Sequence, residues 1–159
     1  MRASALAVAA VLALSGCGGD GGGDDEPAAP ERPAVTKNES DARLLSGAAE
    51  KFKREGTAAI AAVRSGLTQG DYDDDLNKDV YELRGAIYRF DQALRRIAFE
   101  RASEGRANDI LSSNSAAIAQ LDPIIDASRW PDDTEERVKR VLENVEATMD
   151  DTDALVARL

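Results

Sequence analysis

Hydrophobic side chains recur every three or four residues from about Ser40 to the end of the chain, which is the period of an amphipathic helix. The clearest run, in which steps of four and three alternate, consists of Leu76, Val80, Leu83, Ile87, Phe90, Leu94 and Ile97. Residues 73–75 are aspartates, and Arg95 and Arg96 lie near the end of the run, a charge order that the helix macrodipole favours. This run predicts a helix over about residues 74–102.

A preceding helix is predicted from Ser40, which can cap its N-terminus, to Gly70, which can end it. Its expected core face consists of Leu44, Ala48, Phe52, Ala59, Ile60, Val63 and Leu67. Gly47, Gly56 and Gly66 lie inside the helix, and each interior glycine costs about 1 kcal/mol relative to alanine. We therefore expect this helix to depend on its neighbours, or its glycines to let another backbone approach closely.

Two further helices are expected in the last third of the chain. The core face of the first is Ala107, Ile110, Leu111, Asn114, Ile118, Leu121 and Ile125, and Pro123 is expected to kink this helix just upstream. The last helix opens with Trp130-Pro131-Asp132 and Glu135, the pattern of a capping box. Its core face is Val138, Leu142, Val145, Met149, Thr152, Val156 and Leu159.

Short loops are expected near residues 68–73, 103–106 and 128–132. Four amphipathic helices joined in this way pack most simply as an all-α, up-down-up-down antiparallel four-helix bundle over residues 40–159. The chain has only three Phe, three Tyr and one Trp, so the seams are almost entirely aliphatic. We expect a narrow, closed core with little room for a large ligand.

The N-terminus has a different composition. Arg2 precedes an apolar stretch from Ala3 to Leu14, which has the length of the apolar region of a signal peptide and is too short to span a bilayer. The next residues, Leu14-Ser15-Gly16-Cys17, resemble the lipobox of bacterial lipoproteins, which signal peptidase II reads. The alternative is an ordinary signal peptide with a chance cysteine near the cleavage site.

The resemblance implies that residues 1–16 are removed and that Cys17 becomes the N-terminus. Its sulfur would carry diacylglycerol and its amine a further acyl chain, which is the kind of double signal that stable anchoring requires. The expected location is the extracytoplasmic face of a cell membrane. Residues 17–39 then form a flexible linker rich in Gly, Asp and Pro, with a root-mean-square span of roughly 25 Å and an extended limit of about 70 Å.

Composition narrows the chemistry that this chain can perform. There is no histidine, and Cys17 is the only cysteine, so the commonest general base and the commonest transition-metal ligands are missing. Without residues 1–16 the chain has 19 basic and 30 acidic residues, a net charge of −11. This charge repels nucleic acid and anionic lipid headgroups. We expect neither an enzyme nor a cofactor other than the covalent lipid.

One cluster has the spacing of metal ligands. Six side chains with oxygen atoms have the spacing of positions one, three, five, seven, nine and twelve of an EF-hand calcium-binding loop. They are Asp71, Asp73, Asp75, Asn77, Asp79 and Glu82. The sixth position should be glycine and is Leu76, and the eighth should be apolar and is Lys78. We interpret the segment as an acidic first turn of a helix, with weak calcium binding at Asp71, Asp73, Asp74 and Asp75 as the alternative hypothesis.

Several other residues have a structural and a functional interpretation. Trp130 is expected to pack over the end of the bundle, with an exposed partner anchor as the alternative. Asn114, near Pro123, either fixes helix register or marks a polar pocket. Tyr81 and Tyr88 are expected to flank the seam with their hydroxyls in water.

Two classes of function remain open. The first is an interaction or structural module that presents its surface to an envelope protein, a wall polymer or another copy of itself. The second is a bundle that binds or senses a small ligand or cation, which a pocket lined by Asn114, Tyr81 or Tyr88 would favour. The filled, aliphatic core favours the first class.

Overall fold

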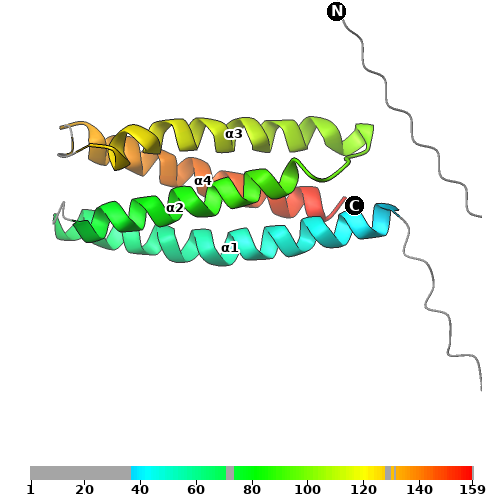
Figure 1. Cartoon of the computed structure of the whole chain (residues 1–159), viewed down its shortest axis with the longest axis horizontal. Coiled ribbons are helices and arrows are strands. Elements are labelled where there is room, and N and C mark those ends of the chain that lie inside the picture. The colour runs from blue at the N-terminus through cyan, green and yellow to red at the C-terminus, as the bar shows by residue number, and fades with distance from the viewer. Residues whose placement is uncertain (1–36, 71–73, 128–129, 131, 159) are drawn as a thin grey trace, which may run out of the picture. The chain divides into compact units, whose positions relative to one another are not determined.

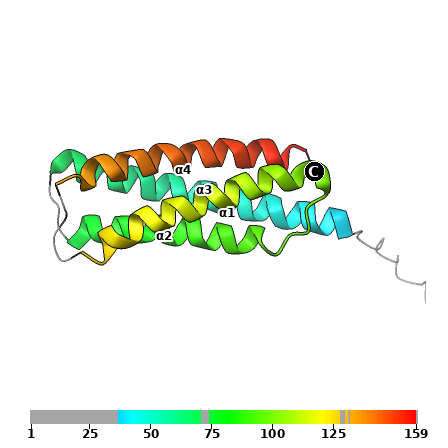
Figure 2. The same ribbon diagram turned by 90° about the horizontal axis from the view of Figure 1, so that it is seen from above.

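The computed structural model describes residues 37–70, 74–127, 130 and 132–158. They form four helices: α1 (Lys37–Gln69), α2 (Asp74–Leu94), α3 (Arg101–Ile125) and α4 (Thr134–Val156). Successive helices run antiparallel, and α1 and α3 each pack on both α2 and α4 (Figure 1, Figure 2). The predicted all-α, up-down-up-down four-helix bundle is therefore confirmed.

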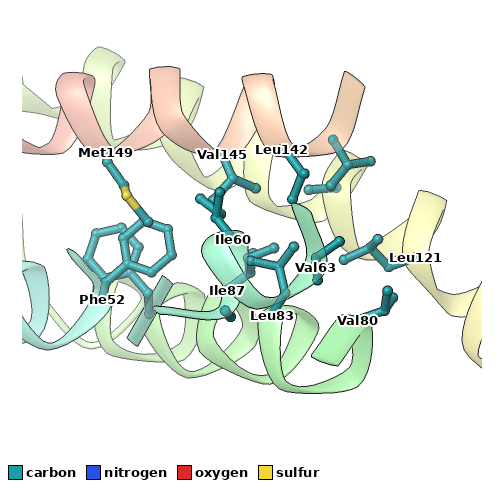
Figure 3. Close-up of a cluster of buried hydrophobic side chains, with 14 of the residues drawn as sticks. Phe52, Ile60, Val63, Val80, Leu83, Ile87, Leu121, Leu142, Val145 and Met149 are labelled. Carbon is teal, nitrogen blue, oxygen red and sulfur yellow. The ribbon is translucent and has the colours of Figure 1, made fainter. Parts of the chain in front are cut away.

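The core consists of aliphatic layers with one aromatic layer (Figure 3). Leu83 and Ile87 from α2 face Val145 from α4, and all three are at most 2% exposed. In the aromatic layer, the rings of Phe52 and Phe90 are stacked with their centroids 4.4 Å apart, beside the side chain of Met149. Removal of these apolar side chains from water is the main stabilising contribution to the bundle.

Two glycines of α1 make room for side chains and not for another backbone. A Cβ atom at Gly66 would lie 2.8 Å from Leu76 Cδ1, and one at Gly56 would overlap Met149 Cε. Gly47 has open space around it. Of the two alternatives that the sequence left open for these glycines, close backbone approach is therefore not observed at Gly56 and Gly66, because large side chains on α2 and α4 fill the space that the missing Cβ atoms leave.

The boundaries of α1 differ from the prediction at its start. The helix begins at Lys37, so Ser40 lies inside the first turn and is not the cap. It ends at Gln69, and Gly70 follows with φ of 71°, the left-handed stop that the sequence predicted. Leu44 was assigned to the core but is 57% exposed, whereas Leu45 is fully buried. Leu45 precedes Phe52 by seven residues, almost two full turns, whereas Leu44 is rotated by about 100° from Leu45.

The connection between α2 and α3 lies earlier than predicted. The second helix ends at Leu94 and not near residue 102, and the predicted loop at 103–106 is inside α3. Residues 95–100 contain neither glycine nor proline, so no local signal marks the end of α2. Ile97 is nevertheless buried, and Phe99 packs against the core. The α2–α3 connection therefore places two side chains against the core at a position where the local sequence predicts no end of the helix.

The third helix continues through Pro123 and ends two residues later at Ile125. Its buried face includes Ala107, Ile110, Asn114 and Leu121 as predicted, together with Ala117 and Ile124. Leu111, Ile118 and Ile125 are only partly buried. The stripe is thus rotated slightly from the predicted one, so that Ala117 and Ile124 face the core in place of Ile118 and Ile125.

The fourth helix begins later than expected. Its N-cap is Asp133, with no side-chain capping hydrogen bond, so the predicted capping box does not form. The carboxylate of Glu135 instead accepts a hydrogen bond from Lys139. Val138, Leu142, Val145, Met149 and Thr152 are buried as predicted. Val141 and Leu155 are also buried, Val156 is partly buried, and Leu159 lies outside the described residues.

Candidate functional site

The proposed lipidation site lies outside the described residues. These omit the lipobox Leu14-Ser15-Gly16-Cys17 and the linker as far as residue 36, so lipid attachment at Cys17 remains a prediction from sequence. Within the described helices, none combines the length and the apolar character needed to cross a bilayer.

The acidic segment before α2 is only partly described. Asp71 and Asp73 lie outside the described residues, whereas Asp74 and Asp75 form the first turn of α2 and are exposed. Leu76 is 1% exposed and belongs to the core. From Asp74 onward the window is regular helix, which supports its interpretation as an acidic helix start. No group of acidic, histidine or cysteine side chains suited to a metal ion occurs in the part of the chain that the structure describes.

Trp130 packs over one end of the bundle, as predicted. Its ring is partly buried against the core, and its Nε1 donates a hydrogen bond to Oδ1 of Asn77 at the start of α2. Asn77 occupies position seven of the EF-hand-like window, so its side-chain oxygen is already used in a hydrogen bond that joins α2 to the α3–α4 connection at this end of the bundle. Trp130 thus acts as a structural contact between the α3–α4 connection and α2.

The three residues whose convergence would favour a ligand pocket do not converge. Tyr81 and Tyr88 are 59% and 46% exposed on α2. Asn114 is 2% exposed, and its Nδ2 has no hydrogen-bond acceptor among the described residues. The tyrosines therefore belong to the surface and Asn114 to the interior.

Ion pairs join neighbouring helices along the sides of the bundle. Arg64 on α1 donates two hydrogen bonds to Glu146 on α4, at 2.8 and 2.7 Å, and Lys53 pairs with Asp153. The hydrogen bond to Glu146 raises the pKa of Arg64 above its ordinary value. Both members of each pair are about half exposed, so each pair contributes little to the stability of the bundle.

A different kind of surface lies on α2 and α3. Arg84 donates a hydrogen bond to Asp122 of α3 at 2.7 Å, which raises the pKa of Arg84, and its guanidinium lies 5.6 Å from the ring centroid of Tyr88. On α3, no charged residue occurs between Asp109 and Asp122 in a chain with 31% charged residues. The exposed or partly exposed residues on this side of α2 and α3 are here called the α2–α3 face; they are Tyr81, Arg84, Tyr88, Asn108, Ser112, Ser115 and Ala119.

Sequence reasoning placed the tyrosines beside the seam but did not identify the α2–α3 face. The available signal was the uncharged interval between Asp109 and Asp122. Its meaning depended on knowing which of these residues point away from the core and which helix lies beside them.

Comparison with known proteins found no matching family model, no matching curated protein and no matching solved structure.

Proposed function

We propose that this chain is a lipid-anchored protein on the extracytoplasmic face of a cell membrane, where its four-helix bundle acts as a noncatalytic interaction or structural module of the envelope. The observation that carries this proposal is the single cysteine, Cys17, in a lipobox-like sequence directly after an apolar signal-like segment. An acidic segment rich in Gly, Asp and Pro follows it in the sequence, and the four helices of the bundle come after that segment.

The charge of the chain supports attachment through lipid. A net charge of −11 without residues 1–16 opposes contact with an anionic headgroup surface, so electrostatic adsorption is unfavourable. Acyl chains supply about 0.8 kcal/mol per buried CH₂, which is sufficient for stable anchoring when more than one chain is attached.

The character of the bundle supports interaction over catalysis. Its interior consists mostly of aliphatic side chains, and the chain has no histidine to act as a general base at neutral pH. The α2–α3 face combines exposed tyrosines with small polar residues and has few charges, and such a surface is suited to contact with another macromolecule.

Substitution Cys17→Ser tests the anchor. We expect the unaltered protein to sediment with membranes, to remain there in high salt and to be released by detergent, whereas the variant is recovered in the soluble fraction. Mass spectrometry of the unaltered protein should find an N-terminal peptide that begins at Cys17 and carries lipid. Far-ultraviolet circular dichroism provides the control, because the variant should keep the helical spectrum of the bundle.

Retention of the Cys17→Ser variant in salt-washed membranes would contradict the proposal. A mature N-terminus at any residue other than Cys17 would do the same.

A further inference from the structure

We infer that two tyrosines of α2, Tyr81 and Tyr88, bind an uncharged β-1,4-linked glycan across three consecutive sugars. Arg84 and its partner Asp122 on α3 bind the middle sugar. The inference rests on the proposed function of the bundle as an interaction module of the envelope, because it names the partner of that module. It does not depend on the lipid anchor.

The two tyrosines have the spacing of alternate sugars in such a chain. Tyr81 and Tyr88 are seven residues apart, almost two full turns, so they lie about 10 Å apart on one side of α2. They are 59% and 46% exposed, and among the described residues only Leu44 is a comparably exposed large apolar side chain. In an extended β-1,4-linked glycan each sugar is turned over relative to the one before it, so every second sugar presents the same face. Two sugars of that chain span about the same length as the two tyrosines.

A tyrosine ring and a β-linked sugar have complementary surfaces. The C–H groups on one face of the sugar ring are weakly positive and the face of the aromatic ring is negative, so the two faces pack against each other. This packing uses the tyrosine ring and leaves its hydroxyl able to hydrogen-bond a sugar hydroxyl. Two tyrosines at this spacing therefore suit the first and third of three sugars.

Arg84 lies between the tyrosines along α2 and is close to both. Its guanidinium is 5.6 Å from the ring centroid of Tyr88. The hydrogen bond to Asp122 is the main cause of its raised pKa, and the hydroxyls of both tyrosines contribute. Nε of Arg84 donates to Oδ1 of Asp122, whereas its Nη groups and Oδ2 of Asp122 form no hydrogen bond with another described residue. Donors and an acceptor placed side by side in this way match the neighbouring hydroxyls of one sugar.

Charge favours an uncharged glycan over other polymers. Without residues 1–16 the chain has a net charge of −11, which repels nucleic acids and acidic polysaccharides. A cationic polymer is drawn instead to the more acidic surface of α4, which exposes Glu143, Asp150 and Asp151. Arg84 and Asp122 neutralise each other. Two tyrosines and a neutral ion pair therefore fit a chain that carries many hydroxyl groups and no charge.

Titration followed by nuclear magnetic resonance tests the inference in the full exported chain with Cys17→Ser, which lacks the lipid site. The probes are β-1,4-linked oligomers of N-acetylglucosamine, from the disaccharide to the hexasaccharide. The trisaccharide should bind with a dissociation constant on the order of 1 mM, about fivefold to tenfold lower than that of the disaccharide, because only three sugars reach both tyrosines. Longer oligomers should gain little more. Maltotriose, whose α-1,4 linkages curve the chain, should bind no better than the disaccharide.

Substitutions separate the aromatic contact from general effects on the surface. Tyr88→Ala should raise the dissociation constant of the trisaccharide to that of the disaccharide, whereas Tyr88→Phe should keep the difference, since the ring remains. Arg84→Gln should weaken the trisaccharide about fivefold through lost hydrogen bonds. Leu44→Ala is the matched control, because it removes the other exposed large apolar side chain, on α1, and should leave the dissociation constant unchanged. Circular dichroism verifies that each variant keeps the helical bundle.

Three results would overturn the inference. The first is an equal dissociation constant for the disaccharide and the trisaccharide, and the second is equal weakening by Tyr88→Ala and Leu44→Ala. The third is the absence of resonance changes with every oligomer at about 10 mM, ten times the expected dissociation constant, which would assign the tyrosines to another class of partner. These titrations use a chain without the lipid site, so their failure leaves the membrane-fractionation result at Cys17 unaffected, and the reverse also holds.

Discussion

Asn114 is a buried polar residue in a core that is otherwise mostly apolar, and this makes its replacement informative. The residue is 2% exposed on α3, and its Nδ2 lacks an acceptor among the described residues. A buried amide donor that loses its hydrogen bonds to water on folding costs about 1–3 kcal/mol. We therefore predict that Asn114→Leu stabilises the bundle, since leucine is of similar size and has no polar atom.

The expected magnitude follows from three contributions. Removal of the unpaired donor gives about 1–3 kcal/mol, burial of the apolar side chain adds to it, and leucine also has a higher helix propensity than asparagine by a few tenths of a kcal/mol. Asn144→Leu measures the propensity contribution separately, because Asn144 is exposed in the middle of α4. For a bundle of this size, the midpoint of thermal unfolding should rise by about 4–12 °C more in Asn114→Leu than in this control.

Urea and thermal unfolding, followed by circular dichroism, measure both variants. Equal or lower stability of Asn114→Leu relative to Asn144→Leu would refute the argument that the Asn114 amide is unpaired in the folded state. The slope of the urea transition tests a second role for the residue. An unchanged slope indicates a single packing arrangement, whereas a reduced slope indicates that Asn114 fixes helix register.

Two further comparisons test local features. Gly70→Ala should destabilise the bundle by about 1 kcal/mol in urea unfolding, because φ at this residue is 71°. Gly47→Ala should instead stabilise it by up to about 1 kcal/mol, because Gly47 lies in regular helix with open space around it. Equal effects of the two substitutions would contradict the argument from backbone conformation. Arg95→Ala should lower the midpoint of thermal unfolding more than Arg64→Ala. Arg95 donates a hydrogen bond to the buried carboxylate of Asp91, whereas the partner of Arg64, Glu146, is exposed. A larger decrease in Arg64→Ala would contradict this ranking.

Hydrophobic periodicity was sufficient to predict the number of helices and their order. The steps of three and four between Leu76 and Leu94 identify one face of α2, and every member of that run is buried. The stop at Gly70 was also predictable, because glycine adopts a positive φ without the strain that a side chain introduces. These features depend on neighbouring residues along the chain, and the sequence contains that information directly.

Other boundaries depended on contacts between distant residues. The end of α2 at Leu94 could not be predicted, because residues 95–100 contain no helix breaker and the burial of Ile97 continues the helical pattern. The burial of Leu45 in place of the predicted Leu44 is a similar case. Two adjacent leucines satisfy the pattern almost equally, and only the packing against neighbouring helices distinguishes them.

The candidate sites also differ in whether the sequence alone could identify them. Cys17 and its lipobox-like context are a property of sequence, because a short local motif is what a processing enzyme reads. The α2–α3 face required the tertiary structure, since Tyr81 and Tyr88 are far from Ser112 and Ala119 along the chain and share a side of the bundle only because α2 packs beside α3.

The sequence by itself therefore determined the helical class of this protein, the order of its four helices and the residue proposed to anchor it, because periodicity and short motifs are local. Only the tertiary structure decided where α2 ends, which leucine of α1 is buried and which uncharged residues form one outward face. Those outcomes depend on the relative rotation and offset of packed helices, which are set by contacts between residues distant in sequence.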